Sequence, residues 1–493
     1  MAARGPTGIL VGMDSTPRRR PMRIVVPSRN DRLLSRFTEG LGGPMGKFTA
    51  PGMVSPGFFT VERVLILMTT GAALLALLAK TPCRANGWSN QFYQACYSDW
   101  PALFGARGLG EGIYPFISAG SEFEYPVLLG LLAGFVAWLV PAEAESRWLL
   151  YFDLNAVFAT AAWIVTVIAT MRMANRRPWD AAMVAVAPAM ILSMFINWDI
   201  WAVMLAALGM LAFARSKPAL AGVLIGLGTA LKLYPVLILG AVLVLAIRTF
   251  KWRPAVVTFA ATALTWLAVN VPFALRDFEG WKYFYEFSRD RGAGNSSVWQ
   301  AWNITFPEFE ADAAFIGFWA YFLFALACAG IALLALAAPR RPRMAQLVFL
   351  IVAAFILTNK VYSPQFVLWL VPLLALARPR WRDFLIWQFF EVMHWWAIWL
   401  YLAAILGGGP PENNLDSGWF VLSVAGHMGA TMYLMFRVAL DIWDPRTDPV
   451  RRMGIDDPQG GPFNQAPDRW RLRLGRRPRV PLETDAAPAK EAQ

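Results

Sequence analysis

Residues 221–239 read AGVLIGLGTALKLYPVLIL, and two apolar runs in this stretch meet at one lysine. The runs on either side of Lys232 hold no other charge, and each is shorter than the roughly 20 residues that cross the hydrocarbon of a bilayer comfortably. Short, broken apolar segments typically line a cavity enclosed by protein, because irregular backbone facing lipid would leave amide groups without hydrogen bonds. The stretch therefore predicts a membrane domain whose helices stop at an internal cavity.

The composition of the whole chain agrees with this prediction. The 493 residues are 57% hydrophobic and 16% charged, whereas soluble proteins have about 25% charged residues. Ordinary soluble enzymes, disordered chains, collagens and disulfide scaffolds are excluded. We expect an all-α polytopic membrane protein, a helical bundle with about 12–13 membrane segments, some short or re-entrant. The predicted segments are 62–79, 125–141, 149–171, 179–196, 199–214, 219–231, 234–248, 254–274, 312–338, 344–358, 364–377, 384–405 and 418–440.

Every second loop between these segments is basic, which indicates membrane orientation and not nucleic-acid binding despite the net charge of +12. The basic loops lie near residues 172–177, 215–217, 248–253, 340–343 and 378–382. Placing them in the cytoplasm puts the turns at 197–199, 232–235 and 359–365 on the outer side. Three apparent segments precede the loop at 172–177, which conflicts with this orientation, and we favour a re-entrant segment near 125–148 as the explanation.

The remaining parts of the chain follow from composition. Residues 1–60 and 443–493 are rich in Arg, Pro and Gly, and we predict two disordered cytoplasmic tails around a transmembrane domain at 61–442. Long outer loops are expected at 80–124 and 275–311. Cys83 and Cys96 flank part of the first loop, where they form either a disulfide or two free thiols.

The first outer loop and the following apolar run contain a candidate acid in the stretch CYSDWPALFGARGLGEGIYPFISAGSEFEYPVLLG, residues 96–130. Asp99 stands near Tyr97 and is followed by Arg107, Glu124 and Tyr125. A carboxylate where a membrane cavity meets the outside can have a raised pKa and accept a proton from a hydroxyl. The alternative is an ordinary solvated acid in a loop.

Three outer turns carry polar residues between apolar runs. Asn197 and Asp199 occupy the first, and the other two share a Lys-x-Tyr pattern, which predicts a common anionic ligand such as a phosphate. A lysine at an outer helix end can instead extend toward lipid headgroups. The residues of the two Lys-x-Tyr turns are Lys232, Tyr234, Lys360, Tyr362 and Gln365. No P-loop, GxSxG, CxxC or HExxH pattern occurs, so we expect no nucleotide, metal or other cofactor.

These stretches together resemble glycosyltransferase family 87 over roughly residues 62–440. The resemblance lies in Tyr97-Ser98-Asp99, Arg107-Gly108, Glu124-Tyr125-Pro126, Asn197-Trp198-Asp199, AGVLIGLGTALKLYPVLIL and NKVYSPQFVLWLVPLLAL (359–376). Many relatives have a Gly-Gln pair where this sequence has Asn197 and Trp198. The family implies a GT-C fold and a polyprenyl-phosphate-sugar donor, and it is typical of actinobacteria.

The resemblance also implies roles for individual residues. Asp99 matches the first-loop acid that serves as general base, and the donor phosphate and substrate are expected at Arg107, Lys232, Tyr234, Lys360, Tyr362 and Gln365. His394, in a late helix, suits a histidine of the catalytic cavity, although a packed structural histidine is the alternative. Further expected cavity residues are Tyr97, Glu124, Tyr125, Asn197 and Asp199.

The implied activity is inverting transfer of a sugar, with mannose favoured, to a glycolipid or glycan acceptor of the cell envelope. The expected partners are the polyprenyl-phosphate sugar donor, that acceptor and the lipid bilayer, without nucleic acid. The protein is expected in the bacterial plasma membrane with both termini cytoplasmic and the active site on the outer face. The alternatives are a transporter or flippase of polyprenyl-linked lipid or sugar, whose broken helices also gather isolated charges, and a non-catalytic scaffold.

Overall fold

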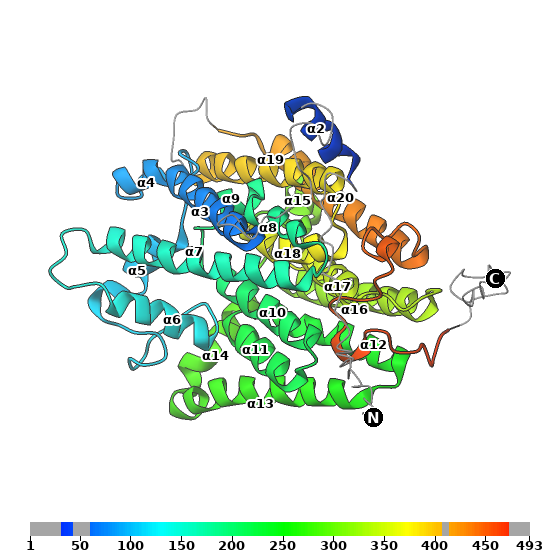
Figure 1. Ribbon diagram of the computed structural model, residues 1–493. Helices are drawn as coiled ribbons and strands as arrows, with labels where there is room; N and C mark the ends of the chain where they lie inside the picture. The colour runs from blue at the N-terminus through cyan, green and yellow to red at the C-terminus, as the bar shows by residue number, and fades with distance from the viewer. Residues whose placement is uncertain (1–30, 43–59, 407–413, 473–493) are drawn as a thin grey trace, which may run out of the picture.

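The structure is a computed structural model that describes residues 31–42, 60–406 and 414–472, and every regular element in these ranges is helical. Six helices in them are long and apolar enough to cross a membrane. They are α3 (Val61–Ala79), α7 (Arg147–Met173), α13 (Trp252–Arg276), α16 (Ala313–Ala337), α19 (Trp381–Leu406) and α20 (Ser417–Trp443). The predicted all-α membrane bundle is confirmed (Figure 1).

Six shorter apolar helical segments complete the bundle. They are α6 (Val127–Trp138), α10 (Asp199–Ala214), α11 (Pro218–Leu231), η3 with α12 (Tyr234–Leu237 and Ile238–Thr249), α17 (Met344–Thr358), and η5 with α18 (Pro364–Phe366 and Val367–Ala377). The predicted segment at 179–196 is wrong. It forms three short pieces instead, η2 (Pro178–Ala181), α8 (Ala182–Ala185) and α9 (Pro188–Ser193), and a proline begins the first and the last because it cannot continue a preceding helix.

The short helices end inside the bundle. At 1.5 Å per residue, the 14 residues of α11 rise about 21 Å, whereas the 25 residues of α13 rise about 38 Å. The N-terminal end of α11 follows the basic loop at 215–217, so its C-terminal end at Lys232 lies well short of the far end of α13. The turns after α11 and α17 therefore lie within the bundle and not at its rim.

Close packing holds α11 against α13. A Cβ atom on Gly222 would lie 2.5 Å from the carbonyl oxygen of Thr258, and one on Gly226 would lie 2.7 Å from that of Thr262. Neither distance is possible for a real side chain, so the two glycines allow the backbones to approach each other. The Thr262 hydroxyl donates to the Gly222 carbonyl at 3.2 Å. This contact fixes the depth at which α11 ends.

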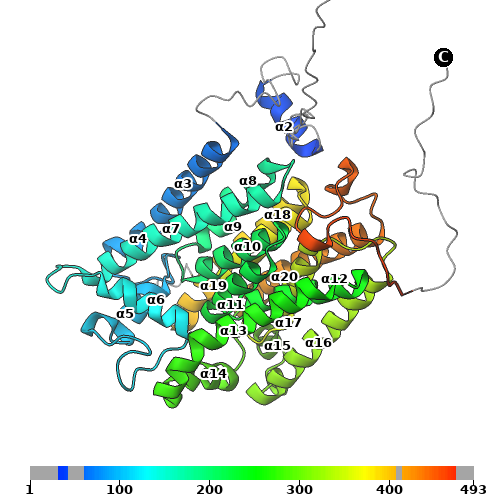
Figure 2. The same ribbon diagram turned by 60° about the horizontal axis from the view of Figure 1, so that its bottom comes forward.

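The 12 residues of α6 rise about 18 Å, which is too short for a hydrocarbon layer of about 30 Å. In the described residues between 60 and the basic loop at 172–177, α3 and α7 are the two helices long and apolar enough to cross a membrane. This count agrees with the re-entrant interpretation of residues 125–148. Figures 1 and 2 both place α4 (Thr81–Ala85), α5 (Asp99–Ala106) and α6 at the same end of the bundle. The second long loop contains α14 (Phe278–Asp290), α15 (Val298–Thr305) and η4 (Pro307–Phe309).

The C-terminal segment Asp444–Leu472 packs against the opposite end, where it is drawn in orange and red in Figures 1 and 2. Arg343 and Asp448 form an ion pair of 2.8 Å in which both side chains are fully buried, and Arg341 pairs with Asp456 at 2.5 Å. Phe463 is also buried. The prediction of a disordered tail from residue 443 is therefore wrong for 444–472, because its acids pair with arginines of the basic loops. The rest of that tail lies outside the described residues.

The predicted N-terminal disordered tail also contains a described helix, α2 (Arg32–Gly42). The Trp381 amide at the start of α19 donates to the Asp31 carboxylate at 3.0 Å. The prediction of disorder is wrong for residues 31–42, since this contact attaches the segment to the bundle. Residues 1–30 and 43–59 of that predicted tail lie outside the described residues.

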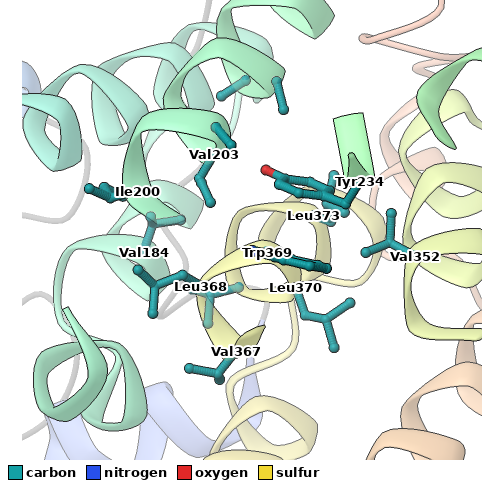
Figure 3. Packing of buried hydrophobic residues seen from close by; sticks show 14 of the residues in the cluster. Val184, Ile200, Val203, Tyr234, Val352, Val367, Leu368, Trp369, Leu370 and Leu373 are labelled. Atoms are coloured by element: carbon teal, nitrogen blue, oxygen red, sulfur yellow. The ribbon is translucent and has the colours of Figure 1, made fainter. Parts of the chain in front are cut away.

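The core beneath the turns is densely aromatic and aliphatic. Tyr234 and Trp369 stack face to face with ring centroids 4.4 Å apart, and Figure 3 shows them among buried residues that include Val203, Val352 and Leu373. The Trp369 indole nitrogen donates to Asp199 at 2.7 Å. The turn at 232–235 is thus anchored to α10 and α18.

Candidate active site

A cavity of about 840 Å³ lies where the three polar turns meet the two long loops. Ten of the thirteen predicted site residues line it, although they come from distant parts of the chain. They are Tyr97, Asp99, Glu124, Tyr125, Asn197, Lys232, Tyr234, Lys360, Tyr362 and Gln365. The structure brings these residues together, and the chemical role of each remains a prediction.

Asp99 is the first residue of α5, and local structure fixes its position. The Ser98 hydroxyl caps this helix by accepting from the Trp100 amide at 3.4 Å, and the Asp99 amide donates to the Ile196 carbonyl at 2.7 Å. The latter bond ties α5 to the turn before α10. The carboxylate accepts one hydrogen bond on each oxygen, from Tyr97 at 2.5 Å and from Tyr125 at 3.0 Å.

The surroundings of Asp99 set its basicity. Burial raises the pKa of the Asp99 carboxyl, while the hydrogen bonds from Tyr97 and Tyr125 and the positive charge of Lys232 partly offset this rise. A carboxylate with a raised pKa is a better proton acceptor than an exposed one. Asp99 can therefore act as a general base toward a hydroxyl group placed in the cavity.

Lys232 is held beside Asp99 by a buried counter-ion. Its ammonium nitrogen lies 2.9 Å from Asp199, which is fully buried, and 4.8 Å from the centre of the Tyr125 ring. Asp199 does not line the cavity as expected. It lies behind Lys232 and orients it, and the ammonium remains in the cavity wall where it can attract an anion.

Lys360 reaches the cavity from the turn after α17. Its ammonium donates to the Arg289 carbonyl at 2.8 Å, and the Lys360 carbonyl accepts from the Gly294 amide at 2.8 Å. Burial lowers the pKa of Lys360. Arg291, which the sequence did not single out, lines the same cavity. The second long loop therefore adds positive charge to this part of the wall.

Tyr362 connects the cavity to a buried polar cluster. Its hydroxyl donates to Glu391 at 2.7 Å, and His427 lies 3.7 Å from the same carboxylate. His394 stacks on His427 with ring centroids 4.1 Å apart and does not line the cavity. The predicted place of His394 in the cavity wall is wrong, because its ring is buried between α19 and α20.

Arg107 also lies outside the cavity wall. Its guanidinium pairs with Glu124 at 2.8 Å and lies 5.8 Å from the centre of the Tyr283 ring. The expected contact between Arg107 and a phosphate is therefore not what the geometry provides. Arg107 neutralises and orients Glu124, an acid that lines the cavity.

Lys80 is a residue that the sequence did not reveal as part of the site. Its ammonium is buried and donates to the Tyr97 carbonyl at 2.6 Å, and burial lowers the pKa of Lys80 to about 7. Cys83 and Cys96 form a disulfide in the same loop. The position of Lys80 at the end of the first apolar helix could have indicated a site residue. Lysines at such helix ends, however, commonly extend to lipid headgroups.

No group of three or more His, Cys, Asp or Glu residues in the described part of the chain is arranged to hold a metal ion. The chemical groups that the cavity offers are a basic carboxylate, two tyrosine hydroxyls on that carboxylate, and lysine cations on separate turns. Such an arrangement can remove a proton from a hydroxyl and stabilise a negative charge nearby.

Comparison with known proteins identifies the class. Residues 123–358 match the model of glycosyltransferase family 87, and with the membrane helices described above the protein is a membrane glycosyltransferase. This match agrees with the family that the sequence predicted. The matched residues include Glu124, Tyr125 and Lys232, whereas Asp99 and Lys360 lie outside them.

A search of curated proteins gave no match. Among solved structures, the chain is similar to the crystal structure of ArnT from Cupriavidus metallidurans bound to undecaprenyl phosphate. The two are 13% identical with a TM-score of 0.42, and the similarity covers 77% of this chain and 78% of that one.

Proposed function

We propose that the protein moves a sugar from a polyprenyl-phosphate donor to a glycolipid or glycan acceptor of the cell envelope. The observation that carries this proposal is that Asp99, Lys232 and Lys360, which are far apart in sequence, line one cavity. A general base for the acceptor and cations for a leaving phosphate are the two requirements of such a transfer. Mannose is the favoured sugar through the family resemblance alone.

The openings of the cavity suit a lipid-linked donor. Leu233, Val236 and Tyr321 line the cavity and are also exposed, Tyr321 to 76%. Two of these side chains are apolar and the third is largely aromatic, so a polyprenyl chain can remain in the hydrocarbon while its phosphate reaches Lys232. A soluble nucleotide sugar would need no such lateral opening.

The reaction we infer is a single displacement. The acceptor oxygen attacks the anomeric carbon and gives its proton to Asp99, while the bond between that carbon and the phosphate oxygen breaks. The leaving phosphate takes the bonding electrons and is stabilised by Lys232 and Lys360. Attack opposite the leaving group inverts the anomeric centre. Tyr97 and Tyr125 keep the Asp99 carboxylate oriented throughout.

We also propose that the cavity faces the outer side of the plasma membrane and that both termini are cytoplasmic. The basic loops lie at the helix ends away from the cavity, and positive loops favour the cytoplasm. The Cys83–Cys96 disulfide lies in the loop that carries Asp99, and disulfides persist in oxidising compartments outside the cytosol. Both observations support the same orientation.

Reconstitution tests this function against the alternative of a transporter or flippase. The full chain is placed in lipid vesicles with a radiolabelled polyprenyl-phosphate sugar and an extract of envelope glycolipids. The proposal predicts that the label moves onto a new glycolipid. Label that crosses the bilayer while still attached to its polyprenyl phosphate would instead identify a transporter and overturn the proposal.

A further inference from the structure

Three aromatic side chains of the cavity wall lie against one another, and the reaction described above gives no role to two of them, Phe92 and Trp399. Phe92 and Tyr97 come from the first long loop and Trp399 from α19, and all three line the cavity. The ring centroids of Phe92 and Tyr97 are 5.3 Å apart, and those of Tyr97 and Trp399 are 5.1 Å apart. We call Phe92, Tyr97 and Trp399 the aromatic wall.

Polar atoms without partners lie around this wall. Trp399 is 3% exposed, and its indole N–H has no hydrogen-bond partner among the described residues. The same is true of the side-chain oxygen of Gln365, which is buried and lines the cavity. Buried polar groups nearly always have partners, since leaving one unpaired costs about 1–3 kcal/mol. These groups are therefore suited to a ligand that brings several hydroxyls.

The aromatic wall lies on one side of the Asp99 carboxylate. Tyr97 donates to one carboxylate oxygen and Tyr125 to the other, and the ammonium of Lys232 lies over the Tyr125 ring. In an inverting displacement the incoming oxygen and the leaving phosphate occupy opposite faces of the anomeric carbon. With the phosphate at Lys232, the acceptor approaches from the side of Tyr97.

We propose that the aromatic wall is the acceptor subsite and that the acceptor presents a sugar ring there. The C–H face of a pyranose covers an aromatic ring, and the indole N–H of Trp399 donates to one of its hydroxyls. Gln365 is available for a further hydroxyl. This inference rests on the proposed function and deepens it, because it assigns the sugar ring of the acceptor to a named part of the cavity wall.

Binding of octyl glycosides tests the assignment. The full chain in nanodiscs is titrated with octyl glycosides of mannose, glucose and galactose, and with octane-1,8-diol as the chain without sugar. We expect Trp399→Ala to weaken binding of the preferred glycoside about tenfold, since it loses a stacking contact and a hydrogen bond. Trp399→Phe should weaken binding of the preferred glycoside by a smaller factor. Trp396→Ala is the matched control, because Trp396 lies on the same helix, is 47% exposed and does not line the cavity.

Affinity for the polyprenyl-phosphate sugar, measured on the same variants, shows that the protein is folded and should stay within twofold. Equal glycoside binding by wild type and Trp399→Ala, including no binding by either, overturns the acceptor subsite. An equal loss of donor and glycoside affinity in Trp399→Ala overturns it too, because the wall would then hold the donor. Failure of the proposed function is a separate result, namely no sugar transfer by the wild type in vesicles.

Discussion

Lys232 interacts with two acids, Asp199 and Asp99. It forms an ion pair with the buried Asp199, and its charge also lowers the pKa of Asp99 against the raising effect of burial. In the proposed reaction the lysine therefore both contacts the leaving phosphate and sets the pKa of the Asp99 carboxyl. Its two effects separate experimentally, because one concerns affinity and the other the pH dependence of the rate.

We predict that Lys232→Met moves the acid limb of the pH profile of kcat/KM to higher pH. Removal of the cation raises the pKa of Asp99, and the reaction needs the deprotonated carboxylate, so activity is lost at a higher pH as the solution is acidified. The variant is made together with Asp199→Asn so that no buried carboxylate is left unpaired. Lys282→Met, at a half-buried lysine of α14 that does not line the cavity, serves as the control. An acid limb that stays at the wild-type pH would contradict this account of Lys232.

The sequence revealed part of this site for an energetic reason. Lys232 and Lys360 interrupt apolar runs, where a charge is costly and hence informative. Lys80 and Trp399 were missed, since a lysine at a helix end and a tryptophan in an apolar helix are both ordinary. Arg107 was placed wrongly, because only the fold shows that Glu124 neutralises it.

At the scale of elements, the depth of the cavity depends on short helices that are held by close contacts. α11 ends at Lys232, and Gly222 and Gly226 allow it to pack on α13. The apolar runs of the sequence predicted twelve of these membrane segments. The thirteenth, 179–196, was wrong because Pro188 interrupts it, and the length of the apolar run does not show this break.

Gly226→Val should destabilise the protein by about 1–3 kcal/mol, which is the usual cost of overpacking. The added side chain would collide with Thr262 and Thr265 on α13 and displace the turn that carries Lys232. Thermal unfolding of the purified protein in detergent measures the effect, and sugar transfer should fall as well. In the control Gly330→Val, the Cβ atom meets nothing within 4 Å. A similar loss of stability in both variants would show that the packing of α11 on α13 is not special.

For the molecule as a whole, the two ends of the bundle are built differently. One end holds the cavity and the disulfide, and the other is covered by Asp444–Leu472, which pairs its acids with the basic loops. The sequence predicted a solvated tail here because local composition does not reveal a distant partner. Buried pairs such as Arg343 with Asp448 arise only once the helices bring the loops together.

Asp448→Ala should cost about 3–5 kcal/mol, because it leaves the buried Arg343 without its counter-ion. The reduced stability would appear as a lower midpoint of thermal unfolding and as faster proteolysis of the C-terminal segment. Asp444→Ala is the matched control, since Asp444 is exposed in the same segment. An equal and small change in both variants would mean that the segment contributes little to the stability of the bundle.

The central claim, that Asp99 is the base of a sugar transfer, is tested most directly by the turnover of Asp99→Asn with a radiolabelled polyprenyl-phosphate sugar. We predict a fall of about 10²–10⁴ in turnover, with unchanged donor affinity and thermal stability. Glu111→Gln, at an exposed acid of the same loop, should keep wild-type turnover. A folded Asp99→Asn protein with turnover near that of the wild type would contradict the claim.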